Sequence, residues 1–201
     1  MVRVAVLVSG GGTNLQALID AQRRGENPYG ELSLVISSKQ GVYALKRAEE
    51  AGIPTAVVHR PDFSTPAEFE AAMLSVLKAY GIEVIVLAGF LSILSDGFIS
   101  RFRDRILNVH PSLIPAFCGE GYYGLRVHEA ALARGVKVTG ATVHLVNEIC
   151  DGGRILLQKP VEVRPDDTPE HLQRRVMEEA EWVLLPQAVA QLCRELEEEY
   201  R

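Results

Sequence analysis

The chain of 201 residues lacks the features of a membrane or secreted protein. No apolar run is long enough to span a bilayer, and a strand-like segment, residues 2–8, follows Met1 without a basic region or a cleavage site. The cysteines are odd in number and widely spaced, which predicts reduced thiols rather than a disulfide framework or a zinc site. They are Cys118, Cys150 and Cys193. We therefore expect a cytoplasmic protein.

An excess of basic residues is also missing. The formal net charge is -5, with 47% hydrophobic and 23% charged residues. This composition predicts one globular domain over residues 1–201, and it argues against both disorder and a broad nucleic-acid surface. An anionic ligand must then be held by a few local groups. Monomer and homodimer both remain open.

Several catalytic motifs do not occur. The chain has no Gly-Lys-Ser/Thr phosphate loop and no Gly-x-Ser-x-Gly elbow. His128-Glu129 begins like a zinc-protease helix, but Leu132 stands where the second histidine is required. The other histidines away from residue 110 show no ligand spacing: His59, His144 and His171. We expect no metal.

Strand-like and helix-like segments alternate along the first half. Short runs rich in Val, Ile and Leu occupy residues 2–8, 32–37, 55–58, 83–87 and 106–109. Residues 67–80 have apolar positions at spacings of three and four and end before Gly81, which predicts a helix. This order predicts an α/β fold with a mostly parallel central sheet and helices on both faces.

The second half changes style. A glycine-rich loop, residues 117–126, precedes a short helix near 127–134, and strands are expected over 138–146 and 154–163. These strands should extend the sheet with antiparallel pairing. A final helix should begin after Thr168 as N-cap, and Pro186 should kink or divide it.

The tripeptide Asn108-Val109-His110 is the most informative local feature. If residues 106–109 form a strand, Asn108 and His110 project from the same face, because side chains alternate with period two. Pro111 cannot donate to a ladder and ends the strand there. The pair then faces a crevice at the carboxyl end of a strand, where open α/β sheets bind ligands. A histidine that only caps the strand end is an equally open interpretation.

A glycine-rich turn, SGGGTNLQ at residues 9–16, closes the first strand and opens a helix. Thr13 and Gln16 have the spacing of a capping box. A dinucleotide site is disfavoured because the third glycine of that fingerprint is missing. The pattern favours a monophosphate held by the amides of Gly12, Thr13 and Asn14 over a purely structural turn.

The segment Asp151-Gly152-Gly153 could place a carboxylate at the same crevice, since two glycines leave the backbone unhindered. Turn formation alone would also explain Asp-Gly-Gly, and the isolated motif favours that simpler interpretation.

Taken together, the segments SGGGTNLQ (9–16), LAGFLSIL (87–94), NVHPSLIP (108–115), GATVH (140–144) and DGG (151–153) resemble the motifs of the phosphoribosylglycinamide formyltransferase family. The match covers nearly the whole chain in order. The resemblance implies a Rossmann-like formyltransferase fold with a nucleotide-phosphate half (1–107) and a catalytic and folate-binding half (108–201). It also implies 10-formyltetrahydrofolate as donor and glycinamide ribonucleotide as acceptor.

Residue by residue, the resemblance implies catalytic roles for Asn108, His110 and Asp151. It implies that the ribonucleotide is bound by Gly12, Thr13, Asn14 and Glu181. It implies that the folate is held, largely through backbone groups, by Leu91, Ser92, Ile93, Leu94 and Asn108, with Val143 and Asn147 on the other side. The chain departs from the family at Ser92 (often Arg), Pro66 (often an arginine for the folate tail) and Trp182 (usually His).

Formyl transfer requires hydrogen-bond donors where negative charge develops on the formyl oxygen. The Asn108 amide and a protonated His110 are expected to supply them, with Asp151 favouring the imidazolium. The nearest alternative is a 10-formyltetrahydrofolate hydrolase with the same three residues. Such enzymes carry an additional N-terminal regulatory domain, whereas here the first strand begins at Val2. A non-catalytic nucleotide-binding module has no use for three converging polar groups. The 117–126 loop is interpreted as a mobile lid, with a packed surface loop as a nearly equal alternative.

Overall fold

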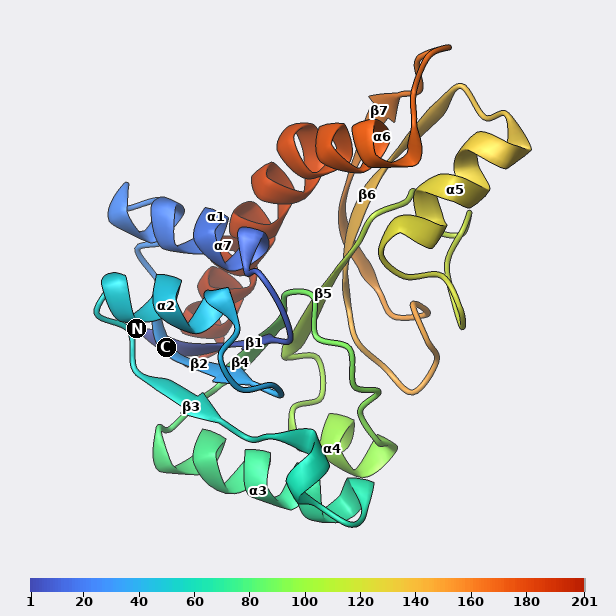
Figure 1. Cartoon of the computed structure of the whole chain (residues 1–201). Coiled ribbons are helices and arrows are strands. Elements are labelled where there is room, and N and C mark those ends of the chain that lie inside the picture. Colours follow the sequence, from blue (N-terminus) through green and yellow to red (C-terminus); the bar gives the residue numbers. More distant parts are fainter. Residues whose placement is uncertain (201) are drawn as a thin grey trace.

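The computed structural model describes residues 1–200, whose strands form one sheet in the order β3-β2-β1-β4-β5-β6-β7 (Figure 1). Strands β1 to β5 are parallel, β6 runs antiparallel to β5, and β7 runs antiparallel to β6. The expected fold class is confirmed. The strands are β1 Val2–Val8, β2 Gly30–Ser37, β3 Thr55–Val57, β4 Val84–Leu87, β5 Ile106–His110, β6 Val138–Leu145 and β7 Ile155–Glu162.

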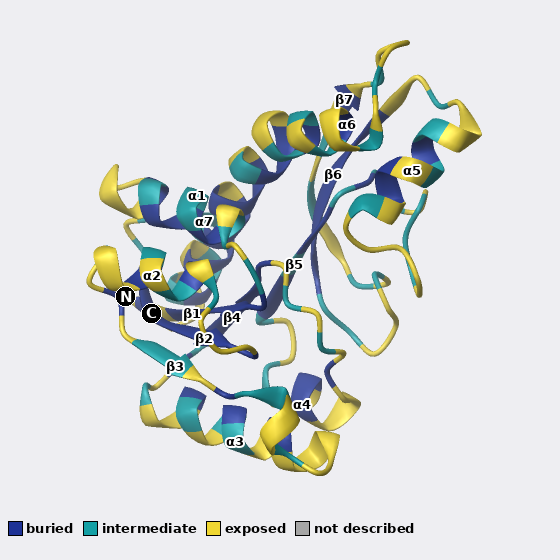
Figure 2. Cartoon of the chain, viewed as in Figure 1, coloured by how far each residue is buried: buried dark blue, intermediate teal, exposed yellow. Residues whose placement is uncertain are grey.

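Helices cover both faces of the sheet, and in Figure 2 their buried sides face the strands. The helices are α1 Thr13–Arg23, α2 Tyr43–Glu50, α3 Pro66–Ala79, α4 Asp96–Arg101, α5 Leu125–Arg134, α6 Pro169–Val176 and α7 Trp182–Glu199. Alternation in β1 separates two cores: Val4 and Val6 pack with α1, α2, α6 and α7, whereas Ala5 and Leu7 pack with α3 and α4. Burial on both faces explains why these strands are almost wholly apolar.

The predicted helix over 67–80 is confirmed as α3, and Gly81 follows it with a positive φ of 61°. Its start carries a signal that sequence reasoning overlooked. The Thr65 hydroxyl accepts from the Glu68 amide while the Glu68 carboxylate accepts from the Thr65 amide, and Pro66 occupies the first turn. This capping box satisfies two backbone donors that the helix itself leaves free.

Thr168 is the N-cap of the C-terminal helical run, as predicted, but the expected division at Pro186 is wrong. The division lies upstream of Pro186, at a π-helical turn over Met177–Glu181, and Pro186 is accommodated inside α7. A π-helical turn inserts an extra residue and rotates the following side chains, and such turns are frequent at functional sites. Here the turn ends at Glu181.

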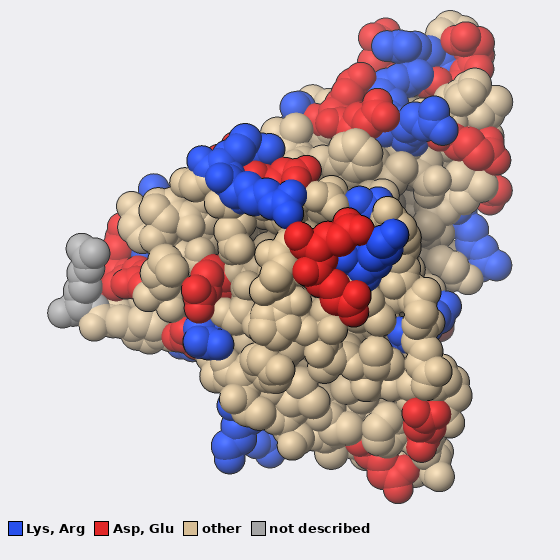
Figure 3. Space-filling view, turned by 60° about the vertical axis from the view of Figure 1, so that its left-hand side comes forward, with Lys and Arg blue, Asp and Glu red and all other residues tan. Residues whose placement is uncertain are grey.

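The N and C marks lie close together in Figure 1. Near these ends, the Met1 amino group pairs with the Glu197 carboxylate at 2.7 Å. The three cysteines are free thiols, as expected. Acidic and basic side chains lie in small mixed groups over the face shown in Figure 3. Within residues 1–200, no helix combines the length and apolar character needed to cross a bilayer.

Candidate active site

The predicted site segments meet at the carboxyl ends of the parallel strands. The sheet order reverses between β1 and β4, and the loops after these two strands hold the glycine-rich turn and the 88–95 segment. The Leu91 amide donates to the Ser9 hydroxyl at 3.1 Å, which ties the two loops together. Because parallel strands are about 4.8 Å apart, the end of β5 lies about 10 Å from the end of β1. A crevice at such a switch point is the usual ligand site of open α/β sheets.

Asn108 and His110 project from the same face of β5, as predicted. Their antiparallel partners on β6 are His144 and Thr142, which therefore share that face. The Asn108 Nδ2 atom lies 3.2 Å from His144 Nε2. His144 Nδ1 lies 2.8 Å from the Leu145 carbonyl oxygen and donates to it, while His144 Nε2 faces both the Asn108 amide and the Asp151 carboxylate. One amide hydrogen of Asn108 is then left for a ligand.

Asp151 lies between the two histidines. Its Oδ2 atom is 3.6 Å from His110 Nδ1, and its Oδ1 atom is 3.4 Å from His144 Nε2. Burial by itself would raise the pKa of the Asp151 carboxyl, but His144, the Gly119 amide and the charge of His110 outweigh it, so the pKa is lowered. The carboxylate is therefore ionised at neutral pH, and the structure brings all three expected catalytic residues together.

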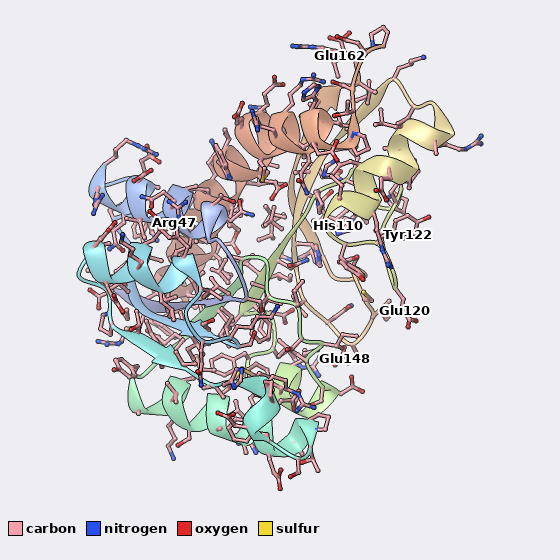
Figure 4. The ribbon with its side chains drawn as sticks, viewed as in Figure 1. Arg47, His110, Glu120, Tyr122, Glu148 and Glu162 are labelled. Atoms are coloured by element: carbon pink, nitrogen blue, oxygen red, sulfur yellow. The ribbon has the colours of Figure 1, made fainter. Side chains whose placement is uncertain are left out.

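The second ring nitrogen of His110 is held by the loop that follows β5. His110 Nε2 lies 2.8 Å from the carbonyl oxygen of Phe117, a residue with a positive φ of 49°. The carbonyl oxygen at Nε2 and the carboxylate oxygen facing Nδ1 are both hydrogen-bond acceptors, so each ring nitrogen faces a group to which it could donate. Figure 4 shows His110 at the strand end with Tyr122 of the loop nearby.

The same loop is anchored a second time, because the Gly119 amide donates to Asp151 Oδ2 at 2.9 Å. Asp151 itself has a positive φ of 53°. A Cβ on Gly153 would lie 1.7 Å from the Leu145 carbonyl oxygen, so the second glycine is required for the backbone to pass β6. The Asp-Gly-Gly segment thus forms a turn and also places the Asp151 carboxylate in the site. Motion of the 117–126 loop stays a prediction.

The expected capping box at Thr13 is wrong. The N-cap of α1 is Gly12, in the left-handed conformation with φ 74°, and no side chain caps the helix. Thr13 is already the first helical residue, so its hydroxyl cannot reach the amide three residues on and instead lies 4.0 Å from Met177 Sδ. Gln16 bonds Asp20 rather than turning back. The first amides of α1 therefore remain without a side-chain cap.

Asn14 and Glu181, both expected to bind the ribonucleotide, contact each other. Asn14 Nδ2 donates to Glu181 Oε2 at 2.8 Å, which brings the π-helical turn against the start of α1. Burial raises the pKa of the Glu181 carboxyl to about 7, and the bond from Asn14 opposes this rise. The Asn14 Oδ1 atom is buried and has no hydrogen-bond partner among the described residues. It is therefore an acceptor that the described chain leaves unsatisfied.

The residues expected at the folate differ in their surroundings. Leu91 and Ile93 are exposed, by 62% and 90%, whereas Leu94 is buried. Just beyond them, the Glu70 carboxylate accepts from the Ser95 amide at 2.6 Å and fixes the start of α4. The exposed side chains of Leu91 and Ile93 thus form an apolar surface, and Glu70 holds the backbone just after them in place.

Two further folate candidates are less favourably placed. The Val143 side chain is fully buried in the core on the face opposite His144, so only its backbone borders the site. Asn147 bonds the Ile149 amide inside the β6–β7 loop. The three positions that depart from the family differ in their surroundings: Pro66 begins α3, Ser92 is half-buried, and the Trp182 Nε1 atom is buried without a partner in the described chain.

Sequence reasoning missed His144 and the Phe117 carbonyl as parts of the site. His144 was present in the GATVH segment, and period two would place it on a face with Thr142, but only the register of β6 against β5 sets it beside Asn108. His128 is buried on α5, and burial, reinforced by the charge of His110, lowers its pKa to about 4. Within residues 1–200, no group of three or more His, Cys, Asp or Glu side chains is arranged to hold a metal ion.

With this geometry in place, comparison with known proteins defines the class. The model of the formyl transferase family matches residues 2–189. The chain is 43% identical over 179 residues to phosphoribosylglycinamide formyltransferase of Haemophilus influenzae. The aligned residues cover 89% of this chain and 82% of that protein. The chain therefore belongs to the formyl transferase family. Within it, the chain is a member of the phosphoribosylglycinamide formyltransferase family.

A solved structure agrees over almost the full length. Glycinamide ribonucleotide transformylase 1 from Symbiobacterium toebii superimposes with a TM-score of 0.90 at 40% identity, covering 97% of this chain and 89% of that chain. The chain is also 45% identical over 188 residues to the trifunctional purine biosynthetic protein adenosine-3 of Gallus gallus, which covers 94% of this chain but 18% of that protein. It thus spans about a fifth of the length of the trifunctional relative.

Proposed function

We propose that the chain transfers the formyl group of 10-formyltetrahydrofolate to the amine of glycinamide ribonucleotide, a step of purine biosynthesis. The observation that carries the proposal is the convergence of Asn108, His110 and Asp151 beside the glycine-rich turn. The names of the relatives support the choice of acceptor, and membership of the formyl transferase family supports a formyl donor.

In the proposed binding mode, the ribonucleotide phosphate lies at the start of α1, against the amides of Gly12, Thr13 and Asn14. These amides lie at the positive end of the helix dipole, where an anion is stabilised. Glu181 contacts the acceptor. The folate lies along Leu91 to Leu94, with the β6–β7 loop on its other side.

The amine attacks the formyl carbon, and charge develops on the formyl oxygen as the tetrahedral adduct forms. The second amide hydrogen of Asn108 and the His110 imidazolium stabilise that oxyanion. Asp151 keeps His110 protonated, since its ionised carboxylate lies 3.6 Å from Nδ1. The adduct collapses with cleavage of the bond to the folate nitrogen. The amine proton reaches that nitrogen through His110 or through a water held by Asp151.

A single assay tests this function. The protein is supplied with 10-formyltetrahydrofolate, with and without glycinamide ribonucleotide, and deformylated folate is followed, with His110→Ala as the background control. Deformylation that depends on the ribonucleotide and yields its formylated product is expected. Deformylation at the same rate without the ribonucleotide would instead identify a hydrolase, in which water replaces the amine.

A further inference from the structure

On the side of the glycine-rich turn that faces α2, two carbonyl oxygens of the turn accept hydrogen bonds from α2. The Gly10 oxygen accepts from the Ala44 amide at 3.3 Å, and the Gly11 oxygen accepts from Arg47 Nε at 2.9 Å. In the described chain the one cis peptide bond is Ile114–Pro115, so both of these peptide units are trans. In a trans unit the N–H points opposite to the C=O. The amides of Gly11 and Gly12 are therefore directed away from α2.

The Arg47 guanidinium is fixed in place by two further contacts. Its Nη1 atom donates to Gln16 Oε1 on α1 at 2.9 Å, and its central carbon lies 4.8 Å from the centre of the Tyr43 ring. Figure 4 shows Arg47 between α1 and α2. Because the Arg47 guanidinium already bonds Gln16 and lies over the Tyr43 ring, it loses little further conformational freedom when it also bonds the Gly11 carbonyl.

Close packing against α2 excludes a side chain at position 12 of the turn. A Cβ on Gly12 would lie 2.6 Å from Ala44 Cβ and 3.5 Å from Arg47 Cδ, so α2 leaves room only for glycine. Without the bond from Arg47, the Gly11–Gly12 peptide unit could rotate, because flanking glycines resist rotation least. The direction of the Gly12 amide would then no longer be fixed.

We infer that Arg47 is a positioning residue of the acceptor site: by holding the Gly11 carbonyl, it turns the Gly12 amide toward the phosphate of the acceptor. This inference rests on the proposed function. Arg47 itself lies on the carbonyl side of the peptide, so it acts through the turn rather than as a phosphate ligand. Its effect is accordingly specific to acceptors that carry a phosphate.

The test compares Arg47→Met with Lys46→Ala, which removes the same charge from the neighbouring, exposed position on α2. For Arg47→Met we expect KM for glycinamide ribonucleotide to rise tenfold or more, with kcat changed less than threefold and KM for the folate unchanged. Lys46→Ala should resemble the parent. Arg47→Lys, which can bond Gly11 but not Gln16 as well, should fall between them.

Glycinamide riboside, the acceptor without its phosphate, separates positioning from general damage. Its kcat/KM should be nearly equal in the parent and in Arg47→Met. An equal loss with both acceptors, or identical behaviour of Arg47→Met and Lys46→Ala, would overturn the inference. Calorimetric binding of glycinamide ribonucleotide gives the same comparison without turnover, so a parent that binds the acceptor but transfers no formyl group would refute the proposed function alone. If Arg47→Met does not fold, Arg47→Lys and Gln16→Ala supply the same tests.

Discussion

The buried Glu181 carboxyl gives the most quantitative prediction. Its pKa is raised from an ordinary value of 4.5 to about 7 because burial removes the carboxylate from water. The folded chain then binds this proton more tightly than the unfolded chain does. Stability from this group is fully present below pH 4.5 and is lost as the pH rises toward and through 7. The whole change corresponds to about 3 kcal/mol.

Glu181→Gln removes the titration and keeps the shape, since the new amide oxygen can still accept from Asn14 Nδ2. We expect the variant to match the parent near pH 4.5 and to exceed its unfolding free energy by up to about 3 kcal/mol at pH 8.5. For a chain of this length the gain corresponds to a rise in Tm of roughly 6 to 12 °C.

Urea unfolding of both proteins at a series of pH values measures the difference directly. Glu178→Gln is the matched control, because Glu178 lies on the same π-helical turn but is exposed, and its pH curve should follow that of the parent. Parallel curves for the parent and Glu181→Gln across pH 4.5 to 8.5 would refute the reasoning. If Glu181 also contacts the acceptor, as proposed, the stabilised variant should have a higher KM for the ribonucleotide, a loss of function in exchange for stability.

Three further substitutions test the proposed chemistry. His110→Ala should lower kcat on the order of a hundredfold or more, with acceptor binding nearly intact by calorimetry, and near-parental turnover would remove His110 from the mechanism. Asp151→Asn keeps a possible acceptor for the Gly119 amide but removes the charge beside His110. Less imidazolium should then be present, and turnover near neutral pH should fall. Imidazole NMR over a pH series checks this, and unchanged spectra would argue against the electrostatic role. Gly12→Val should abolish ribonucleotide binding while folate binding persists, since its side chain would meet Ala44, and equal affinities in both proteins would make the turn merely structural.

The features that the sequence predicted well depend on local periodicity. Period two alone places Asn108 and His110 on one face, and it holds whatever strand lies alongside. The run of apolar strands and helices in the first half likewise predicts a parallel sheet, because buried parallel strands read as continuous hydrophobic segments. The glycine-rich turn was placed correctly at the end of β1 for the same reason.

The features that it missed depend on tertiary register. Thr13 and Gln16 have capping-box spacing, yet the left-handed Gly12 takes the N-cap position and moves Thr13 into the helix. Spacing cannot distinguish these cases, since the lack of room for a side chain at position 12 comes from Ala44 of α2, more than thirty residues further along the chain. The Phe117 carbonyl is a backbone group, so no residue type could have marked it as the partner of His110.

The change of strand direction after β5 explains why the site needs both halves of the chain. The carboxyl ends of parallel strands lie on the same side of the sheet. This is enough to bring the glycine-rich turn and the 88–95 segment together. An antiparallel neighbour adds side chains directly opposite those of β5, at a Cβ separation of about 5 Å. That pairing sets His144 against Asn108, and the hairpin that follows returns Asp151 to the same face. Since β5 ends in Asn108 and His110, it is the strand at which the loops of the parallel half and the side chains of the antiparallel half meet.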